Sequence, residues 1–420
     1  MENHFQQHRI DANGKGLGRF PADATLGEVA SLRWNVLAEE VSLPTAVLRE
    51  SRIEHNLRWM RDFITRYGVK LAPHGKTTMS PALFHRQLEH GAWGITLATA
   101  PQVQAAYRHG IRRVLLANQL VGRANMTIID TLQRDPGFAF WCCVDSVANI
   151  AALGAHFAAA GQRLNVLLEL GVAGGRTGAR DEAAEAALIA EIARWPALRL
   201  CGIELYEGVL KDEAAIRALL RRAATRLQAL SAAGALQTER VVLTGAGSAW
   251  FDVVAEEWSG LTLAQPLDIV LRPGCYLTHD VGIYQAAQQR IEANNPVAQA
   301  MNASLLPALQ LWAYVQSLPE PGVAIIGLGK RDAAFDAGLP QPALHHRPGE
   351  SAPRAAPAGW ALTRMMDQHA FMQVAPNSDV AVGDLVAFEI SHPCLTFDKW
   401  RQLALVDEHY TVTGLVETFF

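Results

Sequence analysis

Short apolar segments alternate with longer helical patterns through most of the chain. The apolar segments are continuous rather than alternating, as expected for parallel strands that are covered on both faces. The strands are predicted at residues 69–76, 94–99, 113–119, 138–145, 165–172, 200–207, 240–247 and 268–276. Helical patterns lie between them, for example at residues 81–90, 101–109, 181–195 and 212–233. Eight strand-then-helix units predict an α/β fold, the (β/α)8 or TIM barrel.

The flanking segments follow other patterns. Residues 43–50 are expected to form an extended lead-in to the barrel, and residues 51–67 have the apolar spacing of an amphipathic helix. Residues 337–359, rich in Pro and Ala, are expected to form an exposed loop or insertion. A smaller, mostly β domain is predicted from strand patterns at residues 308–317, 323–327, 371–374, 385–390 and 410–419. We therefore expect an N-terminal segment (1–42) that packs on the β domain, a barrel (43–290) and a β domain (291–420).

Composition narrows the class of protein. The 420 residues are 50% hydrophobic, enough for one large core and a smaller second one. The net charge of −4 and the lack of a basic block argue against a nucleic-acid partner. No apolar run approaches the roughly 18 residues of a membrane-spanning helix. The five cysteines form no CxxC pair, so we expect reduced thiols in a soluble, cytoplasmic protein.

Lys76 ends the first predicted strand, within Pro-His-Gly-Lys-Thr at residues 73–77. Catalytic groups of such barrels lie at the C-terminal ends of the strands. A lysine at the end of a buried strand is costly unless it has a task, and an amine can form a Schiff base with a carbonyl cofactor. The alternative is a structural lysine whose stem runs along the strand end to solvent.

Glycine-rich loops follow two later strands. Arg176 stands among glycines in residues 171–178, after the fifth strand; a helix cap or a surface position is its alternative role. The seventh strand leads into Thr-Gly-Ala-Gly-Ser at residues 244–248, which is suited to binding phosphate or is simply a tight turn. A lysine, an arginine and a phosphate loop in barrel order predict a pyridoxal phosphate site.

With these motifs the chain resembles the fold-type III pyridoxal phosphate enzymes, which have an alanine racemase-like barrel and a β domain. It resembles most their D-serine dehydratase and D-threonine aldolase branch. Residues 73–77 match that branch's Pro-His-x-Lys-Thr, residues 171–178 resemble its glycine–arginine loop, and residues 272–276 its Arg-Pro-Gly-x-Tyr. The resemblance covers about residues 43–415 and gives Lys76 the Schiff-base role.

The expected site residues follow from the strand ends and from this resemblance. The predicted catalytic residues are Lys76, His74 and Tyr206. The predicted cofactor-binding residues are Lys76, Arg176, Tyr206, Thr244, Gly245, Gly247, Ser248, Gly274, Cys275 and Tyr276.

A possible metal site stands in the β domain. His392 and Cys394 offer an imidazole and a thiolate two positions apart, a set suited to Zn²⁺ or another divalent metal. The alternative is a strand-end histidine beside a core cysteine. In the family that the chain resembles, dehydratases carry His-x-Cys here and aldolases usually His-x-Asp. The pair therefore favours a dehydratase.

Three positions depart from the family pattern or match it loosely. Val209 stands where relatives often carry a histidine, which weakens an aldolase route. Lys330 lies in a loosely matching second lysine motif and is potentially structural. His369 resembles the family's histidine near the metal, with an ordinary loop histidine as the alternative.

The resemblance implies a dehydratase that depends on pyridoxal phosphate and a metal and turns a β-hydroxy-D-amino acid, such as D-serine, into a 2-oxo acid and ammonia. Lys76 would remove the α-proton, and the metal would polarise the β-hydroxyl. The alternatives are retro-aldol cleavage of the D-threonine aldolase type and a non-catalytic protein that binds pyridoxal phosphate. A homodimer is implied by the resemblance only.

Overall fold

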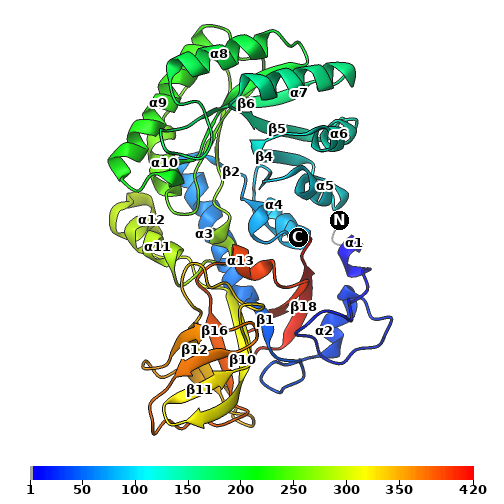
Figure 1. Ribbon diagram of the computed structural model, residues 1–420, viewed down its shortest axis with the longest axis vertical. Helices are drawn as coiled ribbons and strands as arrows, with labels where there is room; N and C mark the ends of the chain where they lie inside the picture. Colours follow the sequence, from blue (N-terminus) through cyan, green and yellow to red (C-terminus); the bar gives the residue numbers. More distant parts are fainter. Residues whose placement is uncertain (1–2) are drawn as a thin grey trace.

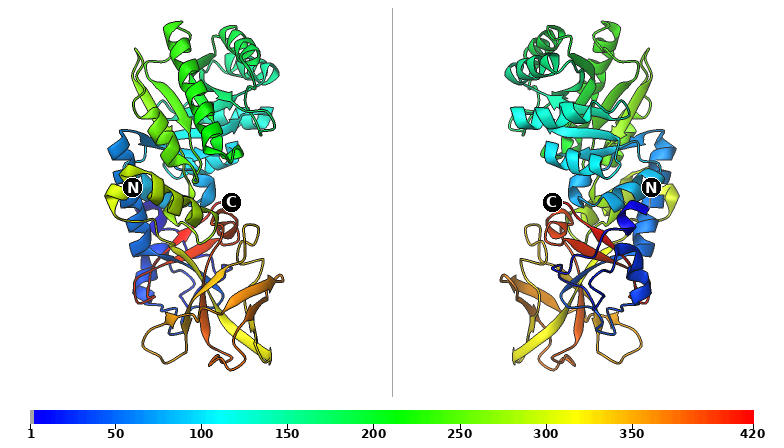
Figure 2. Two further views of the ribbon diagram at one scale, coloured as in Figure 1. Left: turned by 90° about the vertical axis from the view of Figure 1, so that its left-hand side faces the viewer. Right: turned by 90° about the vertical axis from the view of Figure 1, so that its right-hand side faces the viewer.

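Eight parallel strands and a mostly antiparallel sheet form the two ends of an elongated molecule (Figure 1). The computed structural model describes residues 3–420; residues 1–2 of the predicted N-terminal segment lie outside this range. Both views of Figure 2 show the strand-rich part below the barrel, with the C-terminus near the junction. Across residues 3–420, no helix is both long enough and apolar enough to cross a membrane.

The predicted barrel is confirmed. Its strands are β2 Lys70–Leu71, β3 Ile95–Leu97, β4 Arg113–Gln119, β5 Ala139–Val144, β6 Leu164–Leu170, β7 Leu198–Leu205, β8 Val241–Gly245 and β9 Leu267–Leu271. The parallel order is β2-β9-β8-β7-β6-β5-β4-β3. A parallel bridge between His74 and Thr96 joins the two ends, and Thr96 Oγ1 donates to the carbonyl oxygen of Ala72 at 2.7 Å. Barrel closure therefore runs through the segment that carries Lys76.

Helices cover the outside of the barrel, with their apolar faces against the strands. They are α4 Pro81–Glu89, α5 Ala100–Arg108, α6 Arg123–Leu132, α7 Val147–Ala159, α8 Glu182–Ala193, α9 Glu213–Ala232 and α10 Phe251–Trp258. Four of them begin at a side chain that accepts a backbone N–H of the first turn: Thr99, Ser146, Asp181 and Asp212. Such caps satisfy donors that the helix itself leaves unpaired.

The segment expected to lead into the barrel belongs to the second sheet instead. Strand β1, Thr45–Arg49, pairs antiparallel with β10 and parallel with β17. Helix α3, Glu50–Tyr67, follows without a linker and ends at Gly68, whose φ of +65° suits glycine. The buried residues of α3 include Ile53, Leu57, Met60 and Ile64, as its predicted apolar face requires. Helices α11 Ile283–Asn294 and α12 Pro296–Met301 lie between the last barrel strand and β10, and α13 Cys394–Phe397 lies between β16 and β17.

The second sheet contains ten strands, and its central path is β13-β12-β16-β10-β1-β17-β18. Strands β11, β15 and β14 extend it from β10. Besides β1, its strands are β10 Leu309–Glu320, β11 Val323–Ile326, β12 Gln341–His346, β13 Arg354–Ala355, β14 Ala361–Met365, β15 Ala370–Gln373, β16 Leu385–Glu389, β17 Gln402–Val406 and β18 Val412–Glu417. The sequence patterns missed β12, β13, β14 and β17, and they placed the extended segment of β1 at the entry to the barrel.

The N-terminal segment contributes to the core of this sheet. It contains α1 Asn3–Gln6 and α2 Val29–Leu32. Its buried residues Val29, Trp34 and Val36 belong to one hydrophobic cluster with residues of β1, β10, β16, β17 and β18. Apolar burial of this kind supplies most of the attraction that holds an irregular segment on a sheet.

The prediction of an exposed loop at residues 337–359 is wrong for its first half, since residues 341–346 form β12 and pair with β16, whereas residues 348–359 are mostly exposed. This segment forms β12 and β13, and both His345 and His346 are buried. His345 Nε2 donates to Asp384 Oδ2 at 2.8 Å, and His345 Nδ1 accepts from Arg354 Nε at 3.2 Å. Asp384 also accepts two hydrogen bonds from Arg347 at 3.0 Å. Burial opposes ionisation, but the hydrogen bonds from Arg347, Ala381 and His345 lower the pKa of Asp384.

We predict that Asp384→Asn destabilises the protein by about 3 kcal/mol, because it removes the negative charge from a buried pair and leaves the partners under-satisfied. Asp379→Asn is a matched control, since Asp379 pairs with the same Arg347 at 3.0 Å but its side chain is 78% exposed. The control should lose less than about 1 kcal/mol. Urea denaturation measures both values, and equal losses would contradict the assignment.

Candidate active site

A cavity of about 140 Å³ lies at the C-terminal mouth of the barrel. Its lining comes from several strand ends and from the second domain. The predicted site residues that it brings together are His74, Lys76, Arg176, Tyr206, Gly247, Ser248, Gly274, Cys275, His392 and Cys394. Thr77, Ala117, Ala246, Arg272 and Tyr284 complete the lining. Residues up to 320 positions apart in sequence thus share one cavity, and chemistry between the two domains becomes feasible.

Lys76 and His74 flank the point of barrel closure. Lys76 lies on the 3-10 turn Gly75–Thr77 beyond β2, and its side chain is exposed at the cavity rather than buried in a strand. His74 Nδ1 is buried and has no hydrogen-bond partner within residues 3–420. Burial, followed by the charges of Lys76, Arg272 and Arg176, lowers the pKa of His74 well below 6.5. The imidazole is therefore neutral at pH 7 and can accept or donate a hydrogen bond to a ligand.

Tyr206 and Arg176 form one wall of the cavity. Tyr206 follows β7, and the guanidinium of Arg176 stands 5.1 Å from the centre of its ring. Burial, with the neighbouring Glu207 carboxylate, raises the pKa of Tyr206. The phenol therefore keeps its proton at neutral pH and is available as a hydrogen-bond donor.

Some hydrogen-bond donors of the expected phosphate loop already have partners within the protein. The backbone N–H groups of Ala246 and Gly247 donate to Glu207 at 3.0 and 2.7 Å. Ser248 Oγ accepts the N–H groups of Gly274 and Cys275, both at 3.1 Å. An anion that binds at this corner must take over the N–H groups that now face Ser248. Sequence alone did not indicate Glu207 as a competitor.

Three residues predicted to bind the cofactor lie outside the cavity lining. Thr244 Oγ1 donates to the carbonyl oxygen of Val270 at 2.8 Å and is buried. A Cβ on Gly245 would meet Trp258 at 2.9 Å, so this glycine serves core packing. Tyr276 is buried, and its hydroxyl accepts from Gln87 at 3.2 Å. These three positions shape the loops without facing the cavity.

Two glycines leave room for a flat ligand. A Cβ on Gly247 would lie 2.9 Å from the ring of Tyr206, and a Cβ on Gly274 would lie 2.6 Å from the carbonyl oxygen of His74. Together with the unpartnered nitrogen of His74 and the amine of Lys76, this cradle fits a planar carbonyl cofactor such as pyridoxal phosphate.

Beneath the cavity lies a buried charge network. Arg272 donates to Glu204 at 2.5 Å and to Thr244 Oγ1 at 2.9 Å. Glu169 accepts from Gln119 and from Thr177, the neighbour of Arg176. Burial, followed by the charge of Glu204, raises the pKa of Glu169 to about 7. Arg272 was part of a recognised motif, whereas nothing in the sequence patterns indicated Glu169 or Glu204.

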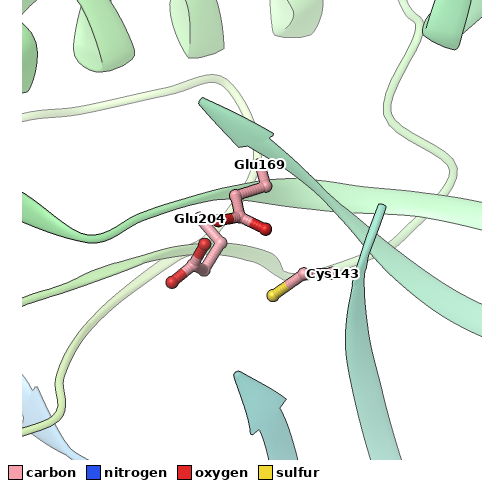
Figure 3. A group of neighbouring side chains, drawn as sticks. All are labelled: Cys143, Glu169 and Glu204. Carbon is pink, nitrogen blue, oxygen red and sulfur yellow. The ribbon is translucent and has the colours of Figure 1, made fainter. Parts of the chain in front are cut away.

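Glu169, Glu204 and Cys143 point toward one another inside the barrel (Figure 3). Their ligand atoms lie within 4.8 Å of one another, the single such group of three found among residues 3–420. However, Arg272 already balances Glu204, and burial raises the pKa of Cys143, which keeps the thiol protonated. We therefore assign this cluster to the support of the cavity and not to a metal.

The predicted metal pair lies at the edge of the same cavity. His392 Nδ1 donates to Asp336 Oδ2 at 2.7 Å, which leaves Nε2 for another partner. Contact with Cys394, and then with Asp336, raises the pKa of His392 to about 9. Hydrogen bonds with Cys275, His392 and Thr77 lower the pKa of Cys394 despite its burial. A carboxylate-oriented imidazole beside a thiolate fits a divalent metal.

Lys330 and His369 are not among the residues that line this cavity. The Lys330 ammonium lies 5.0 Å from the ring centre of Phe335, and its side chain is exposed. His369 is exposed in the turn between β14 and β15, where its carbonyl oxygen accepts from the N–H of Met366 at 2.7 Å. The geometry supports the structural alternative for both.

A larger cavity, of about 730 Å³, opens at the opposite mouth of the barrel. Four arginines, two tryptophans and Asp268 are part of its lining. Asp268 pairs with Lys70 at 2.7 Å and with Arg240 at 2.9 Å. The N-terminal mouth of such barrels serves stability, so the smaller cavity with its convergent polar groups is the candidate active site.

Comparisons with known proteins agree with this fold. The model of the alanine racemase N-terminal domain matches residues 48–278, and that of a putative serine dehydratase domain matches residues 308–406. A D-threonine aldolase from Arthrobacter sp. is 27% identical over 385 residues, or 90% of this chain and 91% of the aldolase. The crystal structure of D-threonine aldolase from Filomicrobium marinum is 25% identical, with a TM-score of 0.74 over 90% of this chain and 95% of its own.

A third relative is D-threo-3-hydroxyaspartate dehydratase from Delftia sp. strain HT23. It is 28% identical over 245 residues, which cover 57% of this chain and 61% of the dehydratase. A cysteine-to-alanine variant of a D-threo-3-hydroxyaspartate dehydratase, solved in a metal-free form, has a TM-score of 0.72 at 22% identity. It covers 92% of this chain and 99% of its own.

We predict a pH-dependent stability difference for Glu169→Gln. The folded-state pKa of about 7 lies above the usual 4.5, so the folded protein holds this proton more tightly than the unfolded chain. The free energy of unfolding therefore falls as pH rises from about 4.5 to about 7, by roughly 1–3 kcal/mol, and then levels off. The neutral glutamine lacks this contribution, so the wild type should lose stability relative to Glu169→Gln over that range.

Urea denaturation at pH 5 and pH 8 measures the difference. Glu239→Gln, at an exposed carboxylate, is the control and should follow the wild type at both values. Parallel pH profiles for the wild type and Glu169→Gln would contradict the assignment of a buried, protonated carboxyl group.

Proposed function

Because the chain belongs to the alanine racemase-like family of pyridoxal phosphate enzymes, we propose that it dehydrates and deaminates a β-hydroxy-D-amino acid to a 2-oxo acid and ammonia. One observation carries the proposal. Lys76, on the first barrel strand end, shares a cavity with His392 and Cys394 of the second domain. The lysine suits chemistry at the α-carbon, and the pair suits a metal that acts on the β-oxygen.

Pyridoxal phosphate, when bound, supplies a carbonyl that condenses with amines and a ring that stabilises negative charge at the α-carbon. Lys76 would hold it, and the free amine of Lys76 is the group placed to accept the α-proton. Neutral His74 would orient the ring by a hydrogen bond. Arg176, Tyr206, Gly247, Ser248, Gly274 and Cys275 would surround the cofactor.

His392 and Cys394 would hold the divalent metal, which supplies Lewis-acid polarisation of a hydroxyl group. This division of roles is supported by position, because Cys394 reaches the cavity from the start of α13, His392 from the segment just before it, and Lys76 from the barrel. A cysteine-to-alanine variant of a D-threo-3-hydroxyaspartate dehydratase has been solved in a metal-free form. We propose zinc, because a thiolate and an imidazole form a soft ligand set.

Three finer points are proposals as well. We propose a cytoplasmic protein, since all five cysteines are free thiols. We propose a homodimer from the resemblance to this fold. We also propose the three regions 1–42, 43–290 and 291–420, with strand β1 contributed to the second sheet from within the second region.

The second candidate function is retro-aldol cleavage of a β-hydroxy-D-amino acid. It is favoured by the D-threonine aldolase relative, which matches 90% of this chain. Against it stand Cys394 and the absence of a histidine at Val209. A non-catalytic protein that binds pyridoxal phosphate is disfavoured, because residues 308–406 match a putative serine dehydratase domain.

We predict that Lys76→Ala loses the visible absorbance band of lysine-bound pyridoxal phosphate. Lys330→Ala should keep the band, because that exposed lysine lies outside the cavity. An absorbance scan of the two purified variants against the wild type measures this. A band that persists in Lys76→Ala would show that another lysine holds the cofactor.

We expect a panel of β-hydroxy-D-amino acids, tested with and without a chelator, to identify the reaction. At least one of D-serine, D-threonine and D-threo-3-hydroxyaspartate should be converted to a 2-oxo acid and ammonia. The chelator should abolish this turnover. If the products are glycine and an aldehyde, the reaction is the retro-aldol cleavage and the dehydratase proposal is wrong. Absence of turnover with retained cofactor would favour the non-catalytic alternative.

A further inference from the structure

Cys275 faces the metal pair as well as the cofactor loop. Its Sγ lies 3.7 Å from Sγ of Cys394, which is 119 residues further along the chain. Cys275 begins the 3-10 turn after β9, and Cys394 begins α13 of the second domain. Thr77 Oγ1 lies 3.4 Å from Cys394 Sγ and 3.9 Å from Cys275 Sγ. Two thiols from different domains therefore meet at the edge of the active-site cavity.

The sulfur–sulfur distance matches that of two ligands on one metal. A disulfide requires about 2.05 Å, so the two cysteines are not bonded. Two thiolates at about 2.3 Å from a tetrahedral zinc stand about 3.8 Å apart. The observed sulfur–sulfur distance of 3.7 Å is close to this value. The two sulfurs can share one ion without moving relative to each other.

We propose that Cys275 is a third protein ligand of the metal held by His392 and Cys394. The inference rests on the metal site of the proposed function and goes beyond it by adding a ligand from the barrel. Binding releases the thiol proton of Cys275 to solvent, and the resulting thiolate donates its electron pair to the metal. Three protein ligands leave one tetrahedral position for the substrate, as in catalytic zinc sites.

The imidazole of His392 completes the set by moving toward the two sulfurs. His392 Nδ1 donates to Asp336, so its Nε2 is the nitrogen that binds the metal. Within residues 3–420, the ligand atoms of Cys275, His392 and Cys394 do not all lie within 4.8 Å of one another. Because the two sulfurs are 3.7 Å apart, the ring of His392 is the part that has to move toward them when the metal binds.

A third ligand of this kind sets the choice of metal. Two sulfurs and one nitrogen strongly favour zinc over manganese or magnesium, which prefer oxygen ligands. A single thiolate with one imidazole discriminates less between these metals, because water or substrate then occupies two or more coordination positions. The competing role of Cys275 is a plain S–H donor to Cys394, which a serine hydroxyl would replace.

Cobalt substitution separates these two roles. The near-ultraviolet band from thiolate-to-cobalt charge transfer grows with the number of thiolates on the ion. Holoenzyme loaded with one Co²⁺ per chain should lose about half of this band in Cys275→Ser and in Cys394→Ser. Cys201→Ser is the control, because Cys201 lies on β7 and contacts Asn165 Oδ1 at 3.5 Å, away from the cavity. It should keep the full band.

Zinc affinity gives a second readout that does not depend on turnover. Competition with a chelator should show a loss of at least about 10-fold for Cys275→Ser, with little change for Cys201→Ser. The absorbance of lysine-bound cofactor reports that the fold survives, since Lys76 is unchanged. A full cobalt band and wild-type affinity in Cys275→Ser would overturn the inference and leave the proposed function intact. A wild type that binds no divalent metal would overturn the metal site of the proposed function itself.

Discussion

The side chain of Asn56 joins the two domains at the point on which the active site depends. It is fully buried on α3, and its Nδ2 donates to the carbonyl oxygens of Leu277 and Leu306 at 2.9 and 2.8 Å. Its Oδ1 accepts the N–H of Leu306 at 2.8 Å. Leu277 ends the turn that begins at Cys275, and residue 306 leads into β10. One amide therefore fixes the Cys275–Leu277 turn at the barrel mouth relative to the second sheet.

The absence of a linker strengthens this constraint. Strand β1 of the second sheet runs directly into α3 of the barrel, and the N–H of Arg49 donates to the carbonyl oxygen of Ala308 at 2.8 Å. The N–H of Ala308 in turn donates to the carbonyl oxygen of Thr278. Buried hydrogen bonds of this kind are costly to break, because each would leave an unsatisfied polar group. The two domains consequently behave as a single support for the cavity, in which Cys394 and Lys76 keep a fixed separation.

The sequence predicted the barrel and most of its mouth because that information is local. Continuous apolar strands, capped helices and glycine turns can each be recognised from about ten consecutive residues. The lead-in at residues 43–50 and the Pro- and Ala-rich segment at residues 337–359 were misplaced because their partners are distant. β12 pairs with β16, about 45 residues further along, and β1 pairs with β10 and β17. The engagement of Glu207 with the phosphate loop is also non-local, since it links two strand ends around the barrel.

The loop from Arg272 to Leu277 contacts each part of the structure that the proposed chemistry needs. Arg272 is anchored below the cavity by Glu204, the N–H groups of Gly274 and Cys275 face the anion corner, and Leu277 is held by Asn56. The α- and β-carbons of an amino acid are bonded neighbours, so the groups that act on them must keep a fixed spacing to within about 1 Å. A short loop pinned at both ends provides that spacing. If the thiol of Cys275 also binds the metal, cofactor and metal are positioned by the same six-residue stretch, and neither can shift without the other.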